Sequence, residues 1–395
     1  ENIKVKIMIK TKLFMSVLFA SLSTYTLAAN THSMDSDKGY LDGINGNLVT
    51  YCAADETACK AVIDMFNADV AAANSSGSFE AKFVRLSTSE MLARVKGELE
   101  KSAQAVKRKC KDMSGDALET CKEATYKAKV DVAFYGTDDP YKASLEDDLF
   151  SPYDYASAGD THPWAADLTA ASDSRLGGLY LGLLAMGVNT ELAAKAGVDI
   201  PQCWADLAKS DYDDSVTIAN WNTSGTAYKF AATVLQAFGS EEAGWEKVIE
   251  IHQSINQYTK SGSAGVKMAA RGETMVGIGF GHDIVALMQQ GFPIELVAPC
   301  EGVLYEIGPV GIVRGAPNRD AAEAFVQYLY EPSTQEVLAS VGSLQFPSNV
   351  NAAVPDGAPA MENFKLLVSD PSFSEKDKKN QIIKKWTDEI FPLPR

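Results

Sequence analysis

The hydrophobic pattern alternates between two kinds of segment along most of the chain. Short runs rich in β-branched and aromatic residues predict strands, and longer amphipathic stretches predict helices. The expected strands cover residues 48–51, 81–86, 131–135, 216–219, 275–280 and 294–298. The expected helices cover residues 56–71, 89–129, 175–186, 226–238, 321–330 and 333–341. Because the two kinds of element alternate, we predict an α/β fold.

The expected helix at 89–129 is unusually long for a globular protein. Its middle, about residues 101–124, is strongly charged and contains Cys110 and Cys121. We interpret this middle as an inserted helical hairpin that is closed by a disulfide bond. Its charged residues are expected to form a solvated helix face.

The amino-terminal segment has the features of a secretory signal peptide. Lysines between residues 4 and 12 precede an apolar run at 13–22, and small residues follow near Ala28. The apolar run is about half of the roughly 20 residues needed to span a bilayer. We therefore expect a signal peptide at 1–28, a linker at 29–46 and an exported, soluble protein.

Composition and charge limit the possible partners. The chain is 46% hydrophobic and 22% charged, which is ordinary for a globular protein, and its length is above the size at which single cores divide into domains. Its net charge of −16 argues against nucleic acid or an anionic membrane surface as a partner. An anionic ligand would have to be held locally, by aimed backbone N–H groups and hydroxyls.

The six cysteines form an even set, and export permits disulfide bonds. Sequence spacing suggests the pairs Cys52–Cys59 and Cys110–Cys121, which leaves Cys203–Cys300. Other pairings remain open at this stage. Zinc binding is less favoured, because the chain lacks both the C-x-x-C spacing and a neighbouring histidine pair.

Seven landmarks follow one another in a characteristic order. They are SEMLAR at 89–94, DVAFYGT at 131–137, LFSPY at 149–153, WADL at 204–207, SGTAY at 224–228, GPVGIVRGAPN at 308–318 and FPS at 346–348. In this order the chain resembles the ferric-type branch, family 1, of bacterial ABC-transporter periplasmic solute-binding proteins. Each motif alone is weak, and their order over most of the chain carries the resemblance.

The resemblance implies a two-lobed periplasmic binding protein of type II, with a ligand cleft between the lobes and two hinge crossings. We place the crossings near Tyr153 and Val303. Lobe 1 would then comprise 47–153 and 304–395, and lobe 2 would comprise 154–303. The resemblance further implies a periplasmic monomer without cofactor or catalytic activity, which delivers its solute to an ABC permease in the inner membrane.

One end of the expected cleft suits a phosphate. The tripeptide Ser224-Gly225-Thr226 follows an expected strand and opens a helix, so its N–H groups and hydroxyls converge at a helix N-terminus. The resemblance implies that these residues contact an anion, together with Thr137 and Ser263 from facing loops. Lys260 and Arg175 are candidates for additional positive charge. The alternative is a simple helix cap with a tight turn.

The other end suits sugar hydroxyls. Ferric members of the family hold iron with two adjacent tyrosines after the strand at 275–280, where this chain has Gly281-His282-Asp283. Loss of both phenolates disfavours iron. His282, Asp283 and Glu306 instead offer acceptors and a switchable donor, a set similar to that of hexose-phosphate-binding members. We therefore predict a sugar phosphate as the ligand.

Several alternatives remain open. A 2-aminoethylphosphonate would keep the phosphate end and pair its ammonium with Asp283 and Glu306, and ferric ion is a further candidate. In an enzymatic alternative, His282, Asp283 and Glu306 would hold a divalent metal for phosphoester hydrolysis. In purely structural readings, His282 lies on the surface, Asp283 caps a helix and Glu306 forms a hinge salt bridge. We expect neither catalytic residues nor a bound metal.

Overall fold

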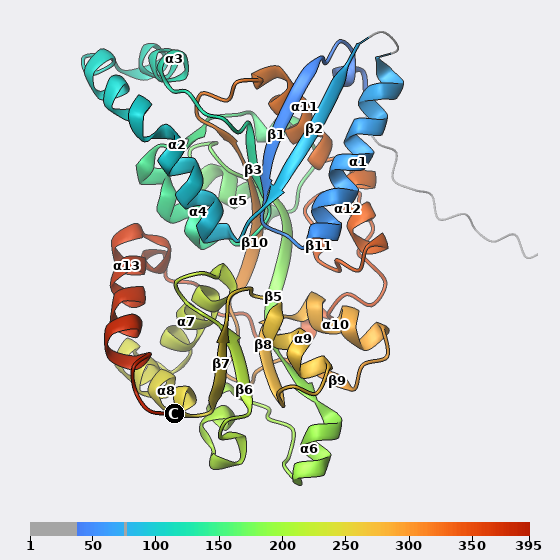
Figure 1. Ribbon diagram of the computed structural model, residues 1–395, viewed down its shortest axis with the longest axis vertical. Helices are drawn as coiled ribbons and strands as arrows, with labels where there is room; N and C mark the ends of the chain where they lie inside the picture. The colour runs from blue at the N-terminus through green and yellow to red at the C-terminus, as the bar shows by residue number, and fades with distance from the viewer. Residues whose placement is uncertain (1–37, 75–76) are drawn as a thin grey trace, which may run out of the picture. The chain divides into compact units, whose positions relative to one another are not determined.

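The computed structural model describes residues 38–74 and 77–395 (Figure 1). The signal peptide predicted at 1–28 lies outside the described residues, as does the first part of the linker. The remainder of that linker begins with a short 3-10 helix, Lys38–Leu41, whose Leu41 is buried. No helix in this part of the chain is long and apolar enough to cross a membrane.

Strands and helices alternate as the hydrophobic pattern predicts. The strands are β1 (Gly46–Cys52), β2 (Phe79–Arg85), β3 (Val132–Phe134), β4 (Phe150–Ser151), β5 (Gly177–Asn189), β6 (Val216–Ala219), β7 (Ile255–Thr259), β8 (Val276–Phe280), β9 (Ile294–Val297), β10 (Tyr305–Val313) and β11 (Phe346–Pro347). The helices are α1 (Glu56–Ala73), α2 (Thr88–Lys109), α3 (Gly115–Thr125), α4 (Asp138–Ser144), α5 (Pro163–Ala171), α6 (Thr190–Ala196), α7 (Gly225–Ala237), α8 (Glu241–Gln253), α9 (Ala264–Ala270), α10 (Gly281–Gln289), α11 (Arg319–Leu329), α12 (Pro332–Ser340) and α13 (Lys376–Lys385).

The strands form two sheets that share β5. In the first sheet, β1 lies parallel to β2 and β3, and β10 is antiparallel to both β3 and the first part of β5. In the second sheet, the last part of β5 is antiparallel to β8 and β9, and β6 lies parallel to β7 and β8. Each sheet therefore combines parallel strands with the antiparallel strand β5 (Figure 1).

Strand β5 changes partners in its middle. Leu183 pairs with Tyr305 of β10, and the next residue, Leu184, pairs with Phe280 of β8. The helix expected at 175–186 is therefore wrong. All residues of β5 are buried, so its apolar run is continuous and carries no period that separates a buried strand from a buried helix.

The strand pairing bears on the two expected crossings between the lobes. Strand β10 begins at Tyr305, beside the crossing expected near Val303. We propose that the first crossing lies within β5 rather than near Tyr153, because the chain changes from the first sheet to the second within this strand. Tyr153 instead lies in a segment that packs against the core of the first sheet.

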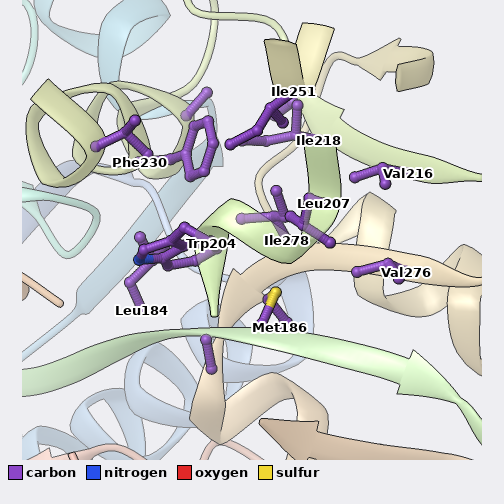
Figure 2. Packing of buried hydrophobic residues seen from close by; sticks show 14 of the residues in the cluster. Leu184, Met186, Trp204, Leu207, Val216, Ile218, Phe230, Ile251, Val276 and Ile278 are labelled. Carbon is purple, nitrogen blue, oxygen red and sulfur yellow. The ribbon is translucent and has the colours of Figure 1, made fainter. Parts of the chain in front are cut away.

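A large hydrophobic core fills the space between the second sheet and its helices. Figure 2 shows its centre, where Trp204 and Phe230 pack beside side chains of β6 and β8. The carboxyl-terminal residues belong to the same core: Trp386 is fully buried, and its ring stacks on Trp221 with centroids 5.2 Å apart. All of residues 304–395 were expected to belong to lobe 1. We propose from this packing that residues 361–395 belong with lobe 2.

All three predicted disulfide bonds are present: Cys52–Cys59, Cys110–Cys121 and Cys203–Cys300. The second bond links the end of α2 to α3, where a helical hairpin was expected within 101–124. That this hairpin is an insertion stays a prediction.

The hairpin is attached to the first sheet by a buried cation. Arg314 is 1% exposed, and its guanidinium pairs with Glu119 at 2.5 Å and Glu123 at 2.9 Å, both in α3, and with Asp148 at 2.6 Å. The charged stretch is therefore not only a solvated helix face. Two of its carboxylates compensate a charge that would otherwise be buried alone.

Replacing Trp386 tests the assignment of the carboxyl-terminal segment to the second core. We expect Trp386→Ala to lower the free energy of unfolding by about 3–5 kcal/mol, because it empties a fully buried aromatic site. Urea denaturation with the disulfides intact measures this change. Val368→Ala is the control, since Val368 is 97% exposed and its loss should cost less than about 0.5 kcal/mol. A loss below about 1 kcal/mol for Trp386→Ala would contradict the assignment.

Candidate functional site

A cavity lies where the carboxyl ends of the parallel strands from both sheets face each other. The ends of β1, β2 and β3 and the residues that follow supply Asp55, Arg85 and Thr137. The segments after β6, β7 and β8, which include the first turns of α7 and α10, supply Ser224–Thr226, Ser261–Ser263 and His282–Asp283. The shared strand β5 adds Tyr180, and β10 adds Glu306. The volume of the cavity is about 110 Å³. In open α/β sheets, ligands bind at such strand ends.

The cavity brings together every residue that the sequence analysis named at either end of the cleft. These residues are Thr137, Ser224, Gly225, Thr226, Ser263, His282, Asp283 and Glu306. Their role in binding stays a prediction. The two cations considered there do not line the cavity: Arg175 donates to the carbonyls of Ser172 and Leu145, and Lys260 pairs with Glu90 at 2.8 Å.

The start of α7 forms one wall of the cavity. Ser224 is the N-cap, and its hydroxyl accepts a hydrogen bond from the backbone N–H of Ala227 at 3.4 Å. Ser224 therefore caps the helix, as the structural alternative for this tripeptide predicted. It does not exclude an anion, because a cap satisfies only part of the first turn and the N–H groups of Gly225 and Thr226 have no partner within the helix.

Glycines allow hydroxyl groups to converge beside this helix end. A Cβ atom on Gly225 would lie 1.8 Å from the hydroxyl oxygen of Thr137, and one on Gly262 would lie 2.1 Å from that of Thr226. The Thr137 hydroxyl is buried and has no hydrogen-bond partner among the described residues. A buried polar group of this kind is normally satisfied, so Thr137 is available to a ligand.

His282 and Asp283 follow β8 and begin α10. His282 is 6% exposed, so it is not a surface residue, and its ring stacks on Phe280 with centroids 5.6 Å apart. Burial lowers the pKa of His282, which keeps the ring neutral at neutral pH. The His282 Nε2 atom lies 3.5 Å from the Gln345 amide nitrogen, where it can accept a hydrogen bond from that amide. Burial also raises the pKa of the Asp283 carboxyl.

Glu306 lies on β10 opposite Gly182 of β5. It is 2% exposed, and its Oε2 has no hydrogen-bond partner in the described part of the chain. A Cβ on Gly182 would lie 2.9 Å from Glu306 Oε1, so only glycine leaves room for this carboxyl. The hinge salt bridge considered for Glu306 is not formed, because the nearby Lys229 pairs with Asp138 and Asp139.

Two ion pairs join the elements on either side of the cavity mouth. Lys267 of α9 pairs with Asp55 beside α1 at 2.7 Å, and Lys260 pairs with Glu90 of α2 at 2.8 Å. Hydrogen bonds from Lys260 and Ser87 lower the pKa of Glu90 to about 2. Pairs this exposed contribute only about 0–1 kcal/mol each, so they align the two sides more than they hold them together.

Polar residues of the cavity that were not predicted from the sequence include Arg85, Tyr180 and Gln345. Arg85 is the only Lys or Arg among the described residues that line it, and its Nε donates to the Ala54 carbonyl at 3.0 Å. Its place at the end of an expected strand was a usable signal. Tyr180 was hidden in the wrongly expected helix, and Gln345 lies in a loop that offers no local pattern.

The metal-dependent alternative requires ligands that converge on one point. Within residues 38–74 and 77–395, only Cys203, Cys300 and Glu301 bring three potential ligand atoms within 4.8 Å of one another. Both of these cysteines are in a disulfide bond. His282, Asp283 and Glu306 do not form such a group, so the geometry does not favour this alternative.

Comparisons with known proteins agree with this arrangement. The family model described as bacterial extracellular solute-binding protein matches residues 129–371. A Haemophilus influenzae protein, described only as uncharacterized, is 31% identical over 373 residues, which cover 94% of this chain and 96% of that one. These matches confirm the predicted family resemblance.

Two solved structures share the fold. The periplasmic binding protein AfuA from Actinobacillus pleuropneumoniae, solved with fructose-6-phosphate bound, has a TM-score of 0.75 at 31% identity and covers 89% of this chain and 100% of its own. Iron-bound HitA from Pseudomonas aeruginosa has a TM-score of 0.63 at 12% identity, with 86% and 98% covered, which shows a likeness of fold alone. The predicted two-lobed α/β fold class is confirmed.

A single added methyl group tests how closely the two sides of the cavity approach. We expect Gly225→Ala to force them apart, because the new Cβ would overlap the Thr137 side chain. Small-angle X-ray scattering should then show a larger radius of gyration than for the parent. The double variant Gly225→Ala/Thr137→Gly removes the overlap and should restore the parent value. An unchanged radius for the single variant would contradict this close approach.

Proposed function

Because the chain belongs to the family of bacterial extracellular solute-binding proteins, we propose that it is the periplasmic solute-binding protein of an ABC importer and binds a hexose phosphate. The observation that carries this proposal is that two chemically different groups of residues line one cavity. One group comprises hydroxyls and a helix N-terminus, and the other comprises the acidic residues Asp283 and Glu306 with a neutral histidine. A phosphate and a sugar ring match these two ends.

The phosphate end holds its anion with donors rather than with a cluster of cations. The first N–H groups of α7 point out of its N-terminus, and this helix has 13 residues, long enough for a developed dipole. The unpartnered hydroxyl of Thr137 faces the same point. Arg85 supplies the positive charge that the sequence analysis sought in Lys260 and Arg175.

The sugar end holds hydroxyl groups through acceptors placed on different elements. Asp283 comes from α10 and Glu306 from β10, so their oxygens approach a ligand from different directions. The neutral ring of His282 can accept one hydrogen bond and donate another. The fructose-6-phosphate in the AfuA structure supports a ligand of this class.

The mechanism that we propose is closure of two lobes on the ligand. Thr137 comes from the first sheet and Ser224–Thr226 from the second, so a phosphate bound between them favours the form in which both sides meet. The pairs Lys267–Asp55 and Lys260–Glu90 form in the same arrangement. The closed form would then be recognised by an ABC permease of the inner membrane.

Two other ligands remain as alternatives with different support. A 2-aminoethylphosphonate would use the same phosphate end and place its ammonium near Asp283. Ferric ion is less favoured: Tyr180 is the only tyrosine among the described lining residues, and its hydroxyl donates to the Gly136 carbonyl at 3.0 Å. Burial raises the pKa of Tyr180 well above its usual range, which disfavours the phenolate that iron requires.

Calorimetric titration with a ligand panel tests the proposal. The panel contains glucose 6-phosphate, 2-aminoethylphosphonate, inorganic phosphate and ferric citrate, all in one buffer. We expect tight binding of glucose 6-phosphate alone. Tight binding of the phosphonate instead would reassign Asp283 and Glu306 while keeping the anion site, and tight ferric binding would refute the hexose phosphate.

Removing Asp283 tests the sugar end. Asp283→Ala leaves sugar hydroxyls without a buried partner, so we expect glucose 6-phosphate to bind about 1–3 kcal/mol less tightly, measured by calorimetry. Asp112→Ala is a matched control at a side chain that is 85% exposed, and it should bind like the parent. Parent-like affinity of Asp283→Ala would show that this carboxyl does not contact the sugar.

Removing Arg85 tests the source of positive charge. We expect Arg85→Ala to weaken glucose 6-phosphate binding by about 1.5–3 kcal/mol, the usual value of a hydrogen bond to a charged group. Arg85→Lys keeps the charge and should recover part of this loss. The salt dependence of the dissociation constant should decrease in Arg85→Ala. If both variants bind like the parent, the phosphate is held by neutral donors alone.

A further inference from the structure

The ionisation state of Glu306 decides what kind of contact it makes. Its side chain is almost completely buried and points into the cavity, and its Oε2 has no partner among the described residues. An ionised carboxyl in such a position would lack both solvent and a hydrogen-bond donor, which is costly. A neutral carboxylic acid, in contrast, carries its own donor.

The charged groups around Glu306 come from the helices α4, α7 and α10. Asp138 and Asp139 belong to α4, Lys229 belongs to α7, and His282 and Asp283 belong to α10. The shared strand β5 adds only the phenol of Tyr180, whose hydroxyl is bonded to a backbone carbonyl. His282 is neutral, so Lys229 is the one cation in this surrounding set that could compensate a charge on Glu306.

Lys229 is already engaged by other carboxylates. Its ammonium lies 2.6 Å from Asp139 and 3.3 Å from Asp138, and all three side chains are nearly inaccessible to solvent. Asp138 is held further by Lys142 at 2.5 Å and accepts from the backbone N–H of Ile307, the residue after Glu306, at 3.2 Å. Asp138 is therefore the ionised member of this cluster, and its charge opposes a second one on Glu306.

Burial first, and the charge of Asp138 second, raise the pKa of Glu306 well above its usual range. Ligand binding would strengthen this effect. A phosphate ester brings about −1.5 to −2 charge into the same cavity and displaces the water that remains there.

We propose that Glu306 contacts the ligand as the neutral carboxylic acid, donating its proton to a ligand oxygen while its carbonyl oxygen accepts from a hydroxyl. This rests on the proposed function. A neutral carboxylic acid can both donate a hydrogen bond to a sugar hydroxyl and accept one, and it does not repel the bound anion. It offers little to an ammonium group, so it also selects the sugar phosphate over an aminoalkylphosphonate.

Paired variants test the proposal through glucose 6-phosphate titrations between pH 7 and pH 9, above the second ionisation of the ligand at about pH 6. We expect Glu306→Ala to lose ~10-fold or more in affinity, since it removes both hydrogen bonds. Glu306→Gln, which keeps one donor and one acceptor, should recover most of that loss. Parent affinity should fall as pH rises and Glu306 ionises, whereas Glu306→Gln should show no such fall. Equal losses in both variants would overturn the proposal while leaving the proposed function intact.

The pH dependence of the free energy of unfolding of the ligand-free protein tests whether Glu306 is protonated, even if glucose 6-phosphate does not bind. A folded carboxyl with a raised pKa keeps a proton that the unfolded chain releases, so the free energy of unfolding falls as pH rises above the ordinary glutamate pKa. Glu306→Gln should remove that part of the pH dependence. Identical pH profiles for the parent and Glu306→Gln would show that the buried carboxyl is ionised and would overturn the proposal.

Discussion

Strand β5 is the constraint on which the rest of the structure depends. All of its residues are buried, and it contributes first to the ladder with β10 and then to the ladders with β8 and β9. Any movement of one sheet relative to the other therefore has to bend or twist this strand. The same two strands carry Tyr180, Gly182 and Glu306 into the cavity. Ligand contacts and the joint between the sheets are therefore built from the same backbone.

The proposed anionic ligand poses an electrostatic problem for an acidic protein. The net charge of −16 repels a phosphate at long range, and Asp55, Asp283 and Glu306 all line the cavity. In our proposal, short-range donors at the start of α7, one arginine and a protonated Glu306 carboxyl offset this repulsion. Lys229 is used to neutralise Asp138 and Asp139 behind β10. The charge balance of the site thus depends on residues that never touch the ligand.

Features with a local signature were predictable from the sequence. Strand β6 has the bounds expected for it, and Ser224 caps the helix that its position after that strand predicted. The disulfide bonds also follow from spacing, because two of them close short loops and leave one remaining pair. Long-range features were not predictable. The apolar run of β5 fits a buried helix equally well, and the packing of Trp386 on Trp221 joins residues far apart in the chain. The charged surroundings of Glu306 became known only from the positions of Asp138 in α4 and Lys229 in α7.

The central claim is that one cavity binds the phosphate group at the start of α7 and the sugar ring at α10 and β10. A crystal structure of the protein with glucose 6-phosphate tests it most directly. The account predicts that the phosphate oxygens accept hydrogen bonds from the backbone N–H groups of Gly225 and Thr226 and from the Thr137 hydroxyl, with sugar hydroxyls on Asp283 and Glu306. A ligand bound in the opposite orientation, or outside this cavity, would contradict the account.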